Sequence, residues 1–309
     1  MNENQSSITA LASAFGRAYH FENDYPKIFS DSAARSLMTE AEYQLMSGHM
    51  AGGLSFFAPE KQLEFSDPRD ALKWVVQTQI SPTPLARAKY CEDMLENAVK
   101  FGARQYVILG AGMDTFAYRS EGAMRAISVF EVDHLDTQIF KKQKVAEAGL
   151  HVPDNLSYVA MDLRKDDIKE ELRKANFNFR QRTFFSLLGV TYYLAKEDFA
   201  DLLCSISAFV PEGSSIVFDY GDEHMFDSSI RRVQNMIAIA KAGGEPMQAC
   251  YSYAELEKLL ENTGWLIYEQ LCPTDIELRF FMNRSDYLHA FEHVNFALAV
   301  MRARGAAEK

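Results

Sequence analysis

Residues 101–309 are predicted to form an α/β domain built on a mainly parallel sheet. From residue 105 onward, short apolar and β-prone runs alternate with segments of helical pattern, which is typical of such a sheet. The run at 106–109 leads directly into the turn Gly110-Ala111-Gly112, and a helical segment follows from Met113. A buried strand, a glycine turn and a helix N-terminus together form the crevice in which such folds bind nucleotides.

Residues 1–100 are predicted to be mostly helical and to form a cap or lid over this domain. Helical patterns cover 7–18, 70–79 and 85–100, whereas 47–68 favours a loop with short helical pieces. Seven strands are expected later in the chain, at 105–109, 128–132, 156–160, 183–188, 214–219, 265–271 and 294–301. Helices are expected around them, at 114–124, 135–148, 165–175, 196–209, 226–242 within an insertion at 221–250, 253–263 and 286–293.

The composition excludes several classes of partner. The net charge is −11 and the sequence pI is about 5.2, with no basic cluster of the kind that nucleic-acid binding requires. No segment has the roughly 18 continuous apolar residues of a membrane span, and the first residues do not resemble a signal peptide. The four cysteines form no CxxC pair, which favours a cytoplasmic protein with reduced thiols. We therefore expect a small-molecule substrate, no nucleic-acid or membrane partner, and a possible homo-oligomer.

Carboxylates follow the next two predicted strands. Asp133 lies 21 residues after Gly112, at the distance where a carboxylate can accept hydrogen bonds from two ribose hydroxyls. Asp162 follows the third strand, where it can accept from an exocyclic amino group while Leu163 packs on the base. Each aspartate alone is more often a helix cap. Their joint occurrence with the glycine turn predicts an adenosine-type ligand.

The residues after the turn discriminate between adenosine cofactors. A dinucleotide fold has a third small residue where this chain has Thr115, and the neighbouring Asp114 would repel a pyrophosphate. A carboxylate there would not repel a sulfonium or an amino group. The pattern thus favours S-adenosylmethionine over NAD(P). Arg87 is a candidate partner for the carboxylate of the cofactor's amino-acid tail, although its spacing alone would favour an exposed helix arginine.

At these motifs the chain resembles the leucine carboxyl methyltransferase family. The resemblance is carried by VILGAGMDT with Tyr118-Arg119, by FEVDH at 130–134, by Asp162-Leu163, and by Thr9-Ala10 and Arg17-Ala18 near the start. It covers residues 8 to 300 and is weakest in the insertion. It implies a Rossmann-like class I methyltransferase sheet of seven strands with an antiparallel last strand and an N-terminal helical cap. It also implies a cofactor site made of Arg87, Gly110, Ala111, Gly112, Asp114, Thr115, Asp133, His134, Asp162, Leu163, Leu188 and Gly189.

Some positions depart from the family pattern. Many members have Glu-Gly after the fourth strand, where this chain has Leu188-Gly189, so a contact there would come from backbone or packing. Ala88 and Phe116 also differ from the commonest family residues. These changes are compatible with cofactor binding but do not allow the leucine-carboxyl substrate to be carried over.

We therefore predict an S-adenosylmethionine-dependent methyltransferase that O-methylates a hydroxyl or carboxyl group of a small molecule. Tyr192 and Tyr193 are the candidate catalytic residues, with Asp219 and His224 nearby after the fifth strand. Tyrosines at such positions are commonly packing residues. A non-catalytic S-adenosylmethionine-binding protein and an NAD(P)-dependent oxidoreductase remain the alternatives.

A zinc-protease pattern, H-x-x-E-H, occurs at 289–293. Two histidines at i and i+4 can share a helix face, but the further ligand of that site lies well downstream in such proteases. Only 16 residues follow His293. We therefore expect no metal site and interpret this segment as a packed or surface helix.

Overall fold

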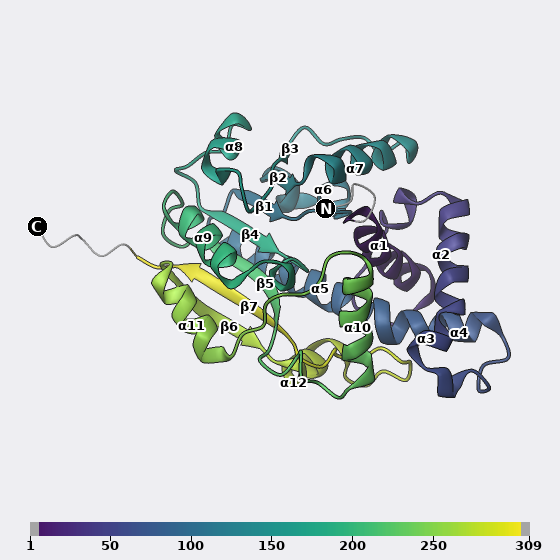
Figure 1. Cartoon of the computed structure of the whole chain (residues 1–309). Coiled ribbons are helices and arrows are strands. Elements are labelled where there is room, and N and C mark those ends of the chain that lie inside the picture. The colour runs from purple at the N-terminus through teal and green to yellow at the C-terminus, as the bar shows by residue number, and fades with distance from the viewer. Residues whose placement is uncertain (1–5, 304–309) are drawn as a thin grey trace, which may run out of the picture.

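The computed structural model describes residues 6–303, and it describes side chains from residue 10 onward. Its centre is a seven-stranded sheet in the order β3-β2-β1-β4-β5-β7-β6 (Figure 1). Strands β1 to β5 pair in parallel, and β7 runs antiparallel to both β5 and β6. The strands are β1 Gln105–Leu109, β2 Ser128–Asp133, β3 Leu156–Ala160, β4 Thr183–Leu187, β5 Ser215–Gly221, β6 Trp265–Leu271 and β7 Val294–Met301. This is the α/β sheet predicted from the sequence, with its antiparallel last strand.

Helices cover both faces of the sheet. The α-helices of the described residues are α1 Ser6–Asn23, α2 Glu40–Gly52, α3 Leu54–Phe57, α4 Pro68–Val75, α5 Pro82–Lys100, α6 Phe116–Arg119, α7 Leu135–Glu147, α8 Ile168–Lys174, α9 Lys196–Ser207, α10 Arg231–Ala242, α11 Tyr253–Asn262 and α12 Pro273–Ile276. Alternation along β1 assigns Tyr106 and Ile108 to the face covered by α5 and α6, and Val107 and Leu109 to the face covered by α8, α9 and α11. Both faces of β1 are therefore buried, as its continuous apolar run indicates.

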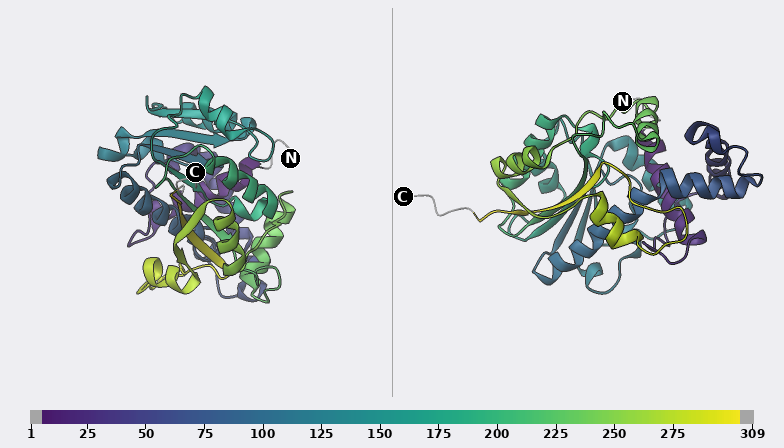
Figure 2. Two further views of the ribbon diagram at one scale, coloured as in Figure 1. Left: turned by 90° about the vertical axis from the view of Figure 1, so that its left-hand side faces the viewer. Right: turned by 90° about the horizontal axis from the view of Figure 1, so that it is seen from below.

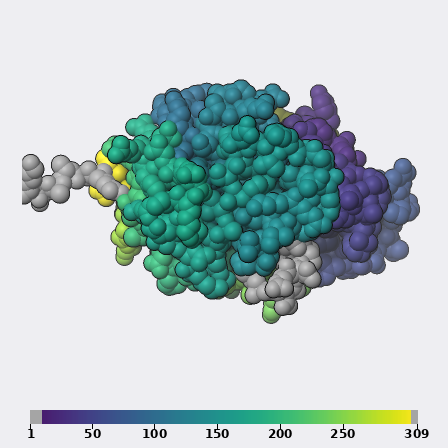
Figure 3. All heavy atoms as spheres, turned by 90° about the horizontal axis from the view of Figure 1, so that it is seen from above, coloured from purple at the N-terminus to yellow at the C-terminus, as the bar shows by residue number. Residues whose placement is uncertain are grey.

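The helices α1 to α4 form a lobe at one end of the sheet (Figure 2). Phe15 of α1 belongs to a buried cluster that also includes Met113, next to the glycine turn, and Val145 of α7. Seen from above, this purple lobe borders the teal surface of the chain's middle part (Figure 3). Helix α10 of the insertion also reaches the lobe, where the Asn235 side-chain amide donates to the Phe57 carbonyl. The lobe is thus attached to the sheet from two sides.

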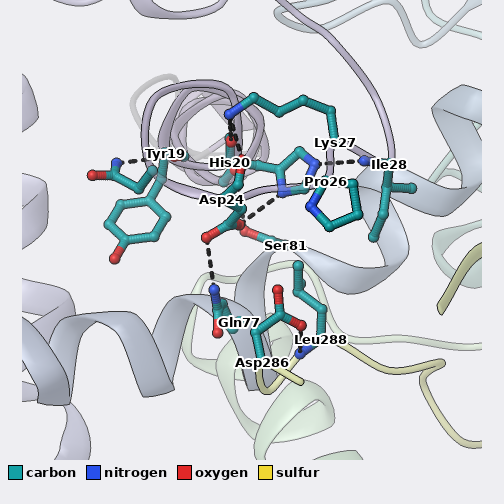
Figure 4. Close-up of polar contacts among 12 residues, drawn as sticks. Tyr19, His20, Asp24, Pro26, Lys27, Ile28, Gln77, Ser81, Asp286 and Leu288 are labelled. Carbon is teal, nitrogen blue, oxygen red and sulfur yellow. Dashed lines mark hydrogen bonds and ion pairs between the residues drawn. The ribbon is translucent and has the colours of Figure 1, made fainter. Parts of the chain in front are cut away.

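A buried polar cluster fixes the end of α1 (Figure 4). The His20 ring accepts the Ile28 N–H at Nε2 (2.8 Å), so its proton lies on Nδ1, which contacts Asp24 at 2.7 Å. The other oxygen of Asp24 accepts from Gln77 (2.6 Å), in the π-helical segment Val76–Ile80 that precedes α5. Because these groups are buried and paired, α1 is held at a defined place relative to α5.

The largest departure from the sequence expectations concerns residues 286–293, which form a loop and not a helix. The helix expected at 114–124 is also interrupted: α6 is short, and a separate 3-10 turn, Gly122–Ala126, follows it. Part of the expected loop at 47–68 belongs to α2, and α10 begins at Arg231, later than expected. Within residues 6–303, no helix is long and apolar enough to cross a membrane.

Candidate functional site

A cavity of about 360 Å³ opens at the carboxyl ends of β1 and β4. The strand order reverses between these two neighbours, because β2 and β3 lie on one side of β1 and β4 and β5 on the other. Open α/β sheets bind ligands at this reversal. The cavity wall contains all twelve residues expected to bind the cofactor, namely Arg87, Gly110, Ala111, Gly112, Asp114, Thr115, Asp133, His134, Asp162, Leu163, Leu188 and Gly189.

The glycine turn needs its glycines. Gly110 and Gly112 have φ values of +70° and +48°, which side chains disfavour. A Cβ on Gly110 would lie 2.5 Å from Cγ2 of Val190, and one on Gly112 would lie 3.3 Å from Cβ of Ala10. The turn is therefore packed between the segment after β4 and helix α1, and its backbone is exposed to the cavity.

Asp133 is fixed by the same turn. One carboxylate oxygen accepts the Gly112 N–H (2.6 Å) and the other accepts the His134 N–H (2.7 Å). Burial raises the pKa of Asp133, and these two donors oppose the increase. Each oxygen keeps a free lone pair, so the group can accept a hydrogen bond from each of two neighbouring ligand hydroxyls.

Asp162 lines the cavity and also holds its own loop. Its carboxylate accepts the Arg164 N–H at 3.1 Å and pairs with Lys165 at 2.8 Å. Burial would raise the pKa of Asp162, but Lys165 and Arg164 lower it to about 2. The alternative that Asp162 is a capping residue is therefore part of its role, since it accepts a backbone N–H of its own loop.

Asp114 and Thr115 point to different partners. The Asp114 carboxylate accepts the Phe116 N–H at the start of α6. The Thr115 hydroxyl is buried and donates to Asp31 at 2.7 Å. Asp31 accepts the Ala34 N–H and is also the centre of a buried ion-pair cluster.

We call this set the Asp31 cluster: Arg17, Asp31, Thr115 and Arg119. Arg17 donates from Nε to Asp31 (2.8 Å) and from Nη2 to the Met113 carbonyl (2.7 Å). Arg119 Nε lies 3.5 Å from Asp31. Burial would raise the pKa of Asp31, but the two arginines hold it below its ordinary value. The cluster joins α1 to the glycine turn.

A second set, the Asp219 cluster, lies at the carboxyl ends of β4 and β5. It consists of Arg87, Gly189, Tyr192 and Asp219, and Asp219 is fully buried. Arg87 Nη1 donates to Asp219 at 2.9 Å, and the Tyr192 hydroxyl donates to the same oxygen at 3.1 Å. Arg87 is thus part of the cavity wall and not an exposed helix arginine.

The two candidate catalytic tyrosines differ in position. Tyr193 lines the cavity, and burial together with Glu245 raises its pKa to about 12. Tyr192 is a donor to Asp219 and is not part of the cavity wall among the described residues. His224 is exposed and also lies outside that wall.

The loop after α10 belongs to the predicted insertion at 221–250, but sequence reasoning named none of its residues as part of the site. Gly244, Glu245, Pro246 and Gln248 line the cavity. The Gln248 N–H donates to the Tyr192 carbonyl (2.7 Å) and its side chain donates to the Tyr193 carbonyl (3.0 Å), which fixes the loop beside the segment after β4. Only the break Gly243-Gly244 marked this loop in the sequence, and nothing there indicated which way it would fold.

The two histidines of the zinc-protease pattern have different partners. His289 contacts Arg232, whereas His293 contacts Asp222. Within the described part of the chain, no group of three or more histidine, cysteine or acidic side chains is placed to hold a metal ion.

The chain is similar to known methyltransferases. The family model for leucine carboxyl methyltransferase matches residues 10–207. The protein YktD of Bacillus subtilis strain 168, provisionally described as an S-adenosyl-L-methionine-dependent methyltransferase, is 48% identical over 306 residues, covering 98% of this chain and 100% of that protein. A Mycobacterium avium protein with the same provisional description is 30% identical over 210 residues, covering 66% of this chain and 68% of its own.

Solved structures show the same fold. A provisionally described methyltransferase from Thermobifida fusca superimposes with a TM-score of 0.54 at 14% identity, covering 97% of each chain. A DUF574 family protein from Streptomyces avermitilis gives 0.55 at 14% identity, over 94% of this chain and 97% of that one. The relatives are described as S-adenosyl-L-methionine-dependent, which disfavours the NAD(P) alternative. The chain therefore belongs to the leucine carboxyl methyltransferase family and is an S-adenosylmethionine-dependent methyltransferase.

Proposed function

We propose that this enzyme methylates an oxygen, in a hydroxyl or carboxyl group, of a small and mainly apolar molecule. The observation that carries the proposal is that segments outside the sheet also line the cavity. Helix α1 contributes Ala10 and Ser13 to its wall, and the loop after α10 contributes Glu245 and Pro246. A covered cavity suits a small acceptor better than a protein surface.

The cavity wall fits the cofactor in three respects. The glycine turn lines the cavity with Gly110, Ala111 and Gly112, so a ligand can approach its backbone. Asp133 has free lone pairs for the two ribose hydroxyls, and Asp162 with Leu163 would hold the adenine. Arg87 would hold the carboxylate of the amino-acid tail. We propose these roles for the residues that the sequence singled out.

The acceptor would contact the remaining wall. Its apolar residues include Ala10, Phe29, Pro84, Ala88, Val190 and Leu194 beside Tyr193, and its polar residues include Ser13, Arg17, Asp31, Arg119, Glu245 and Gln248. When bound, S-adenosylmethionine supplies a methyl group activated by its sulfonium. The protein's contribution is then to align the acceptor oxygen with that methyl group and to exclude water. With a pKa of about 12, Tyr193 keeps its proton at neutral pH and would serve as a hydrogen-bond donor.

We further propose a cytoplasmic enzyme that acts without nucleic acid or membrane. The net charge of −11 supports the absence of a nucleic-acid partner. The four cysteines form no disulfide, which suits a reducing compartment. Whether two copies associate stays a prediction.

The test is methyl transfer from labelled S-adenosylmethionine to a panel of carboxylic acids, phenols, alcohols and amines. We expect labelled products with the first three classes, and preferentially with apolar members. Mild alkali then separates the two oxygen acceptors, because it releases the label from a methyl ester but not from a methyl ether. Transfer only to amines, or only to protein in an extract, would contradict the proposal.

A further inference from the structure

Asp219 has more partners than a simple ion pair requires. Its Oδ1 accepts the Gly189 N–H at 2.6 Å, while its Oδ2 accepts from Arg87 and from the Tyr192 hydroxyl. These donors come from α5, from the turn after β4 and from the next helical turn, Thr191–Tyr193. The carboxylate therefore organises three separate segments around one point.

The guanidinium of Arg87 is also confined from a second side. A Cβ at Gly189 would lie 2.6 Å from Nη1 and 2.7 Å from Nη2, so the guanidinium rests directly on the glycine. Gly189 has a φ of +71°, which also favours glycine. Asp219 and Gly189 together leave the guanidinium of Arg87 little freedom.

The donors of Arg87 are only partly used. A guanidinium has five N–H groups, and within the described residues Arg87 has one hydrogen bond, from Nη1 to Asp219. The side chain is largely buried yet forms part of the cavity wall. A buried cation with unused donors beside a cavity can bind a second anion there.

We propose that Asp219 is a positioning residue, which holds Arg87 so that its unused N–H groups receive the carboxylate of the cofactor's amino-acid tail. Tyr192 supports this role by donating to Asp219. The inference rests on the proposed role of Arg87 in the cofactor site. It also assigns Tyr192 a function other than acid–base catalysis.

Two ligands separate positioning from stability. S-adenosylhomocysteine carries the amino-acid tail, whereas 5′-methylthioadenosine has the adenosine but lacks the tail carboxylate. In Asp219→Asn, the amide oxygen can still accept the Gly189 N–H, but the amide nitrogen then faces Arg87 and Tyr192. Calorimetry should show S-adenosylhomocysteine binding weakened roughly tenfold or more, since a hydrogen bond to a charged group is disrupted. Binding of 5′-methylthioadenosine should change less than about twofold.

A matched pair of conservative variants provides the control. Tyr192→Phe removes one donor to Asp219 and should weaken S-adenosylhomocysteine selectively, though less than Asp219→Asn does. Tyr106→Phe also removes a buried phenol, which contacts Ser186 at 2.9 Å and lies outside the described cavity wall. It should leave the ratio of the two affinities unchanged. In an Arg87→Ala background, Asp219→Asn should add almost nothing to the loss.

The possible outcomes are distinct. Equal weakening of both ligands by Asp219→Asn, or no weakening of either, overturns the positioning role. If that variant does not fold, Gly189→Ala decides, because its Cβ displaces the guanidinium while Asp219 remains; an unchanged affinity ratio would again overturn the role. A wild-type protein that binds neither ligand would instead refute the proposed cofactor site.

Discussion

The Asp31 and Asp219 clusters flank one cavity and have similar components. Each has a fully buried aspartate, an arginine from the N-terminal hundred residues and groups from a turn that follows a strand. They differ in how many donors remain. Arg17 donates from Nε, Nη1 and Nη2, to Asp31, Ser13 and the Met113 carbonyl, so all three of its nitrogens are engaged. Arg87 engages one nitrogen within the described residues.

This difference separates a structural ion pair from one prepared for a ligand. A buried arginine whose three nitrogens each have a protein partner stabilises the fold, and removing its partner leaves an uncompensated charge. A buried arginine with unused donors beside a cavity can bind an anion in addition. We therefore expect changes in the Asp31 cluster to affect stability most, and changes in the Asp219 cluster to affect tail recognition most.

The largest effect is expected from Asp31→Asn. It leaves Arg17 and Arg119 without their shared carboxylate, so the free energy of unfolding should fall by about 3–5 kcal/mol in denaturant titrations. Asp93→Asn is the control, because Asp93 pairs with Lys89 at the surface and should cost about 1 kcal/mol or less. Equal losses in the two variants would remove the basis of the comparison.

The pH dependence of the same variant gives an independent check. The pKa of Asp31 is lower in the folded protein than in the unfolded chain, so its ionised form stabilises the fold above the unfolded value of about 4. That stability is lost as the pH falls below this value towards the folded pKa. Asp31→Asn should therefore flatten part of the acid limb of the stability curve. An unchanged limb would mean that Asp31 is not the group responsible.

The next effect tests the turn between the two clusters. Gly110→Ala places a Cβ 2.5 Å from Val190 and forces a side chain into positive φ, so we expect a loss of about 2–4 kcal/mol. Gly102 is the control: its φ is +98°, and a Cβ added there would have no neighbour within 4 Å. Gly102→Ala should therefore cost only the backbone strain of a positive φ. The double variant with Val190→Ala should recover the steric part. Equal losses of unfolding free energy in Gly110→Ala and Gly102→Ala would show that Val190 moves aside at no measurable cost.

This turn was predictable from the sequence because its determinants are local. A continuous apolar strand, two glycines and an aspartate 21 residues later occupy fixed positions along the chain. The seven strands were predicted within about two residues of their observed ends for the same reason: their apolar runs are bounded by polar, glycine or proline residues. The carboxyl ends of parallel strands then bring the predicted residues together without further information.

The clusters were not predictable because their partners are distant in sequence. Asp31 and Thr115 are 84 positions apart, and Arg87 and Asp219 are 132 apart. The same reason explains the error at 286–293, whose spacing of Leu288 and Phe291 suits a helix. There Glu277 accepts the Ala290 N–H, and Arg232 donates to the Ala290 carbonyl, so side chains from elsewhere satisfy the backbone. No local pattern contains these partners.

A smaller effect compares the two arginines directly. Lysine keeps the charge but loses the planar set of donors. Arg17→Lys should lower the free energy of unfolding by about 1–3 kcal/mol and leave the ratio of S-adenosylhomocysteine to 5′-methylthioadenosine affinity unchanged. Arg87→Lys should reduce that ratio about tenfold with a loss of stability below about 1 kcal/mol. If the two variants behave alike, counting unused donors does not distinguish the clusters.

The smallest effect is expected at the cavity wall, from Tyr193→Phe. Removal of a general base typically costs about 10²–10⁴-fold in rate. Tyr193 has a pKa of about 12, so it is neutral throughout pH 6–9 and can only donate a hydrogen bond. The variant should therefore retain kcat within about tenfold, with a pH profile parallel to that of the wild type. If kcat fell more than about a hundredfold, or if its pH profile shifted with the substitution, Tyr193 would be an acid–base group. Proton transfer, and not positioning alone, would then contribute to catalysis.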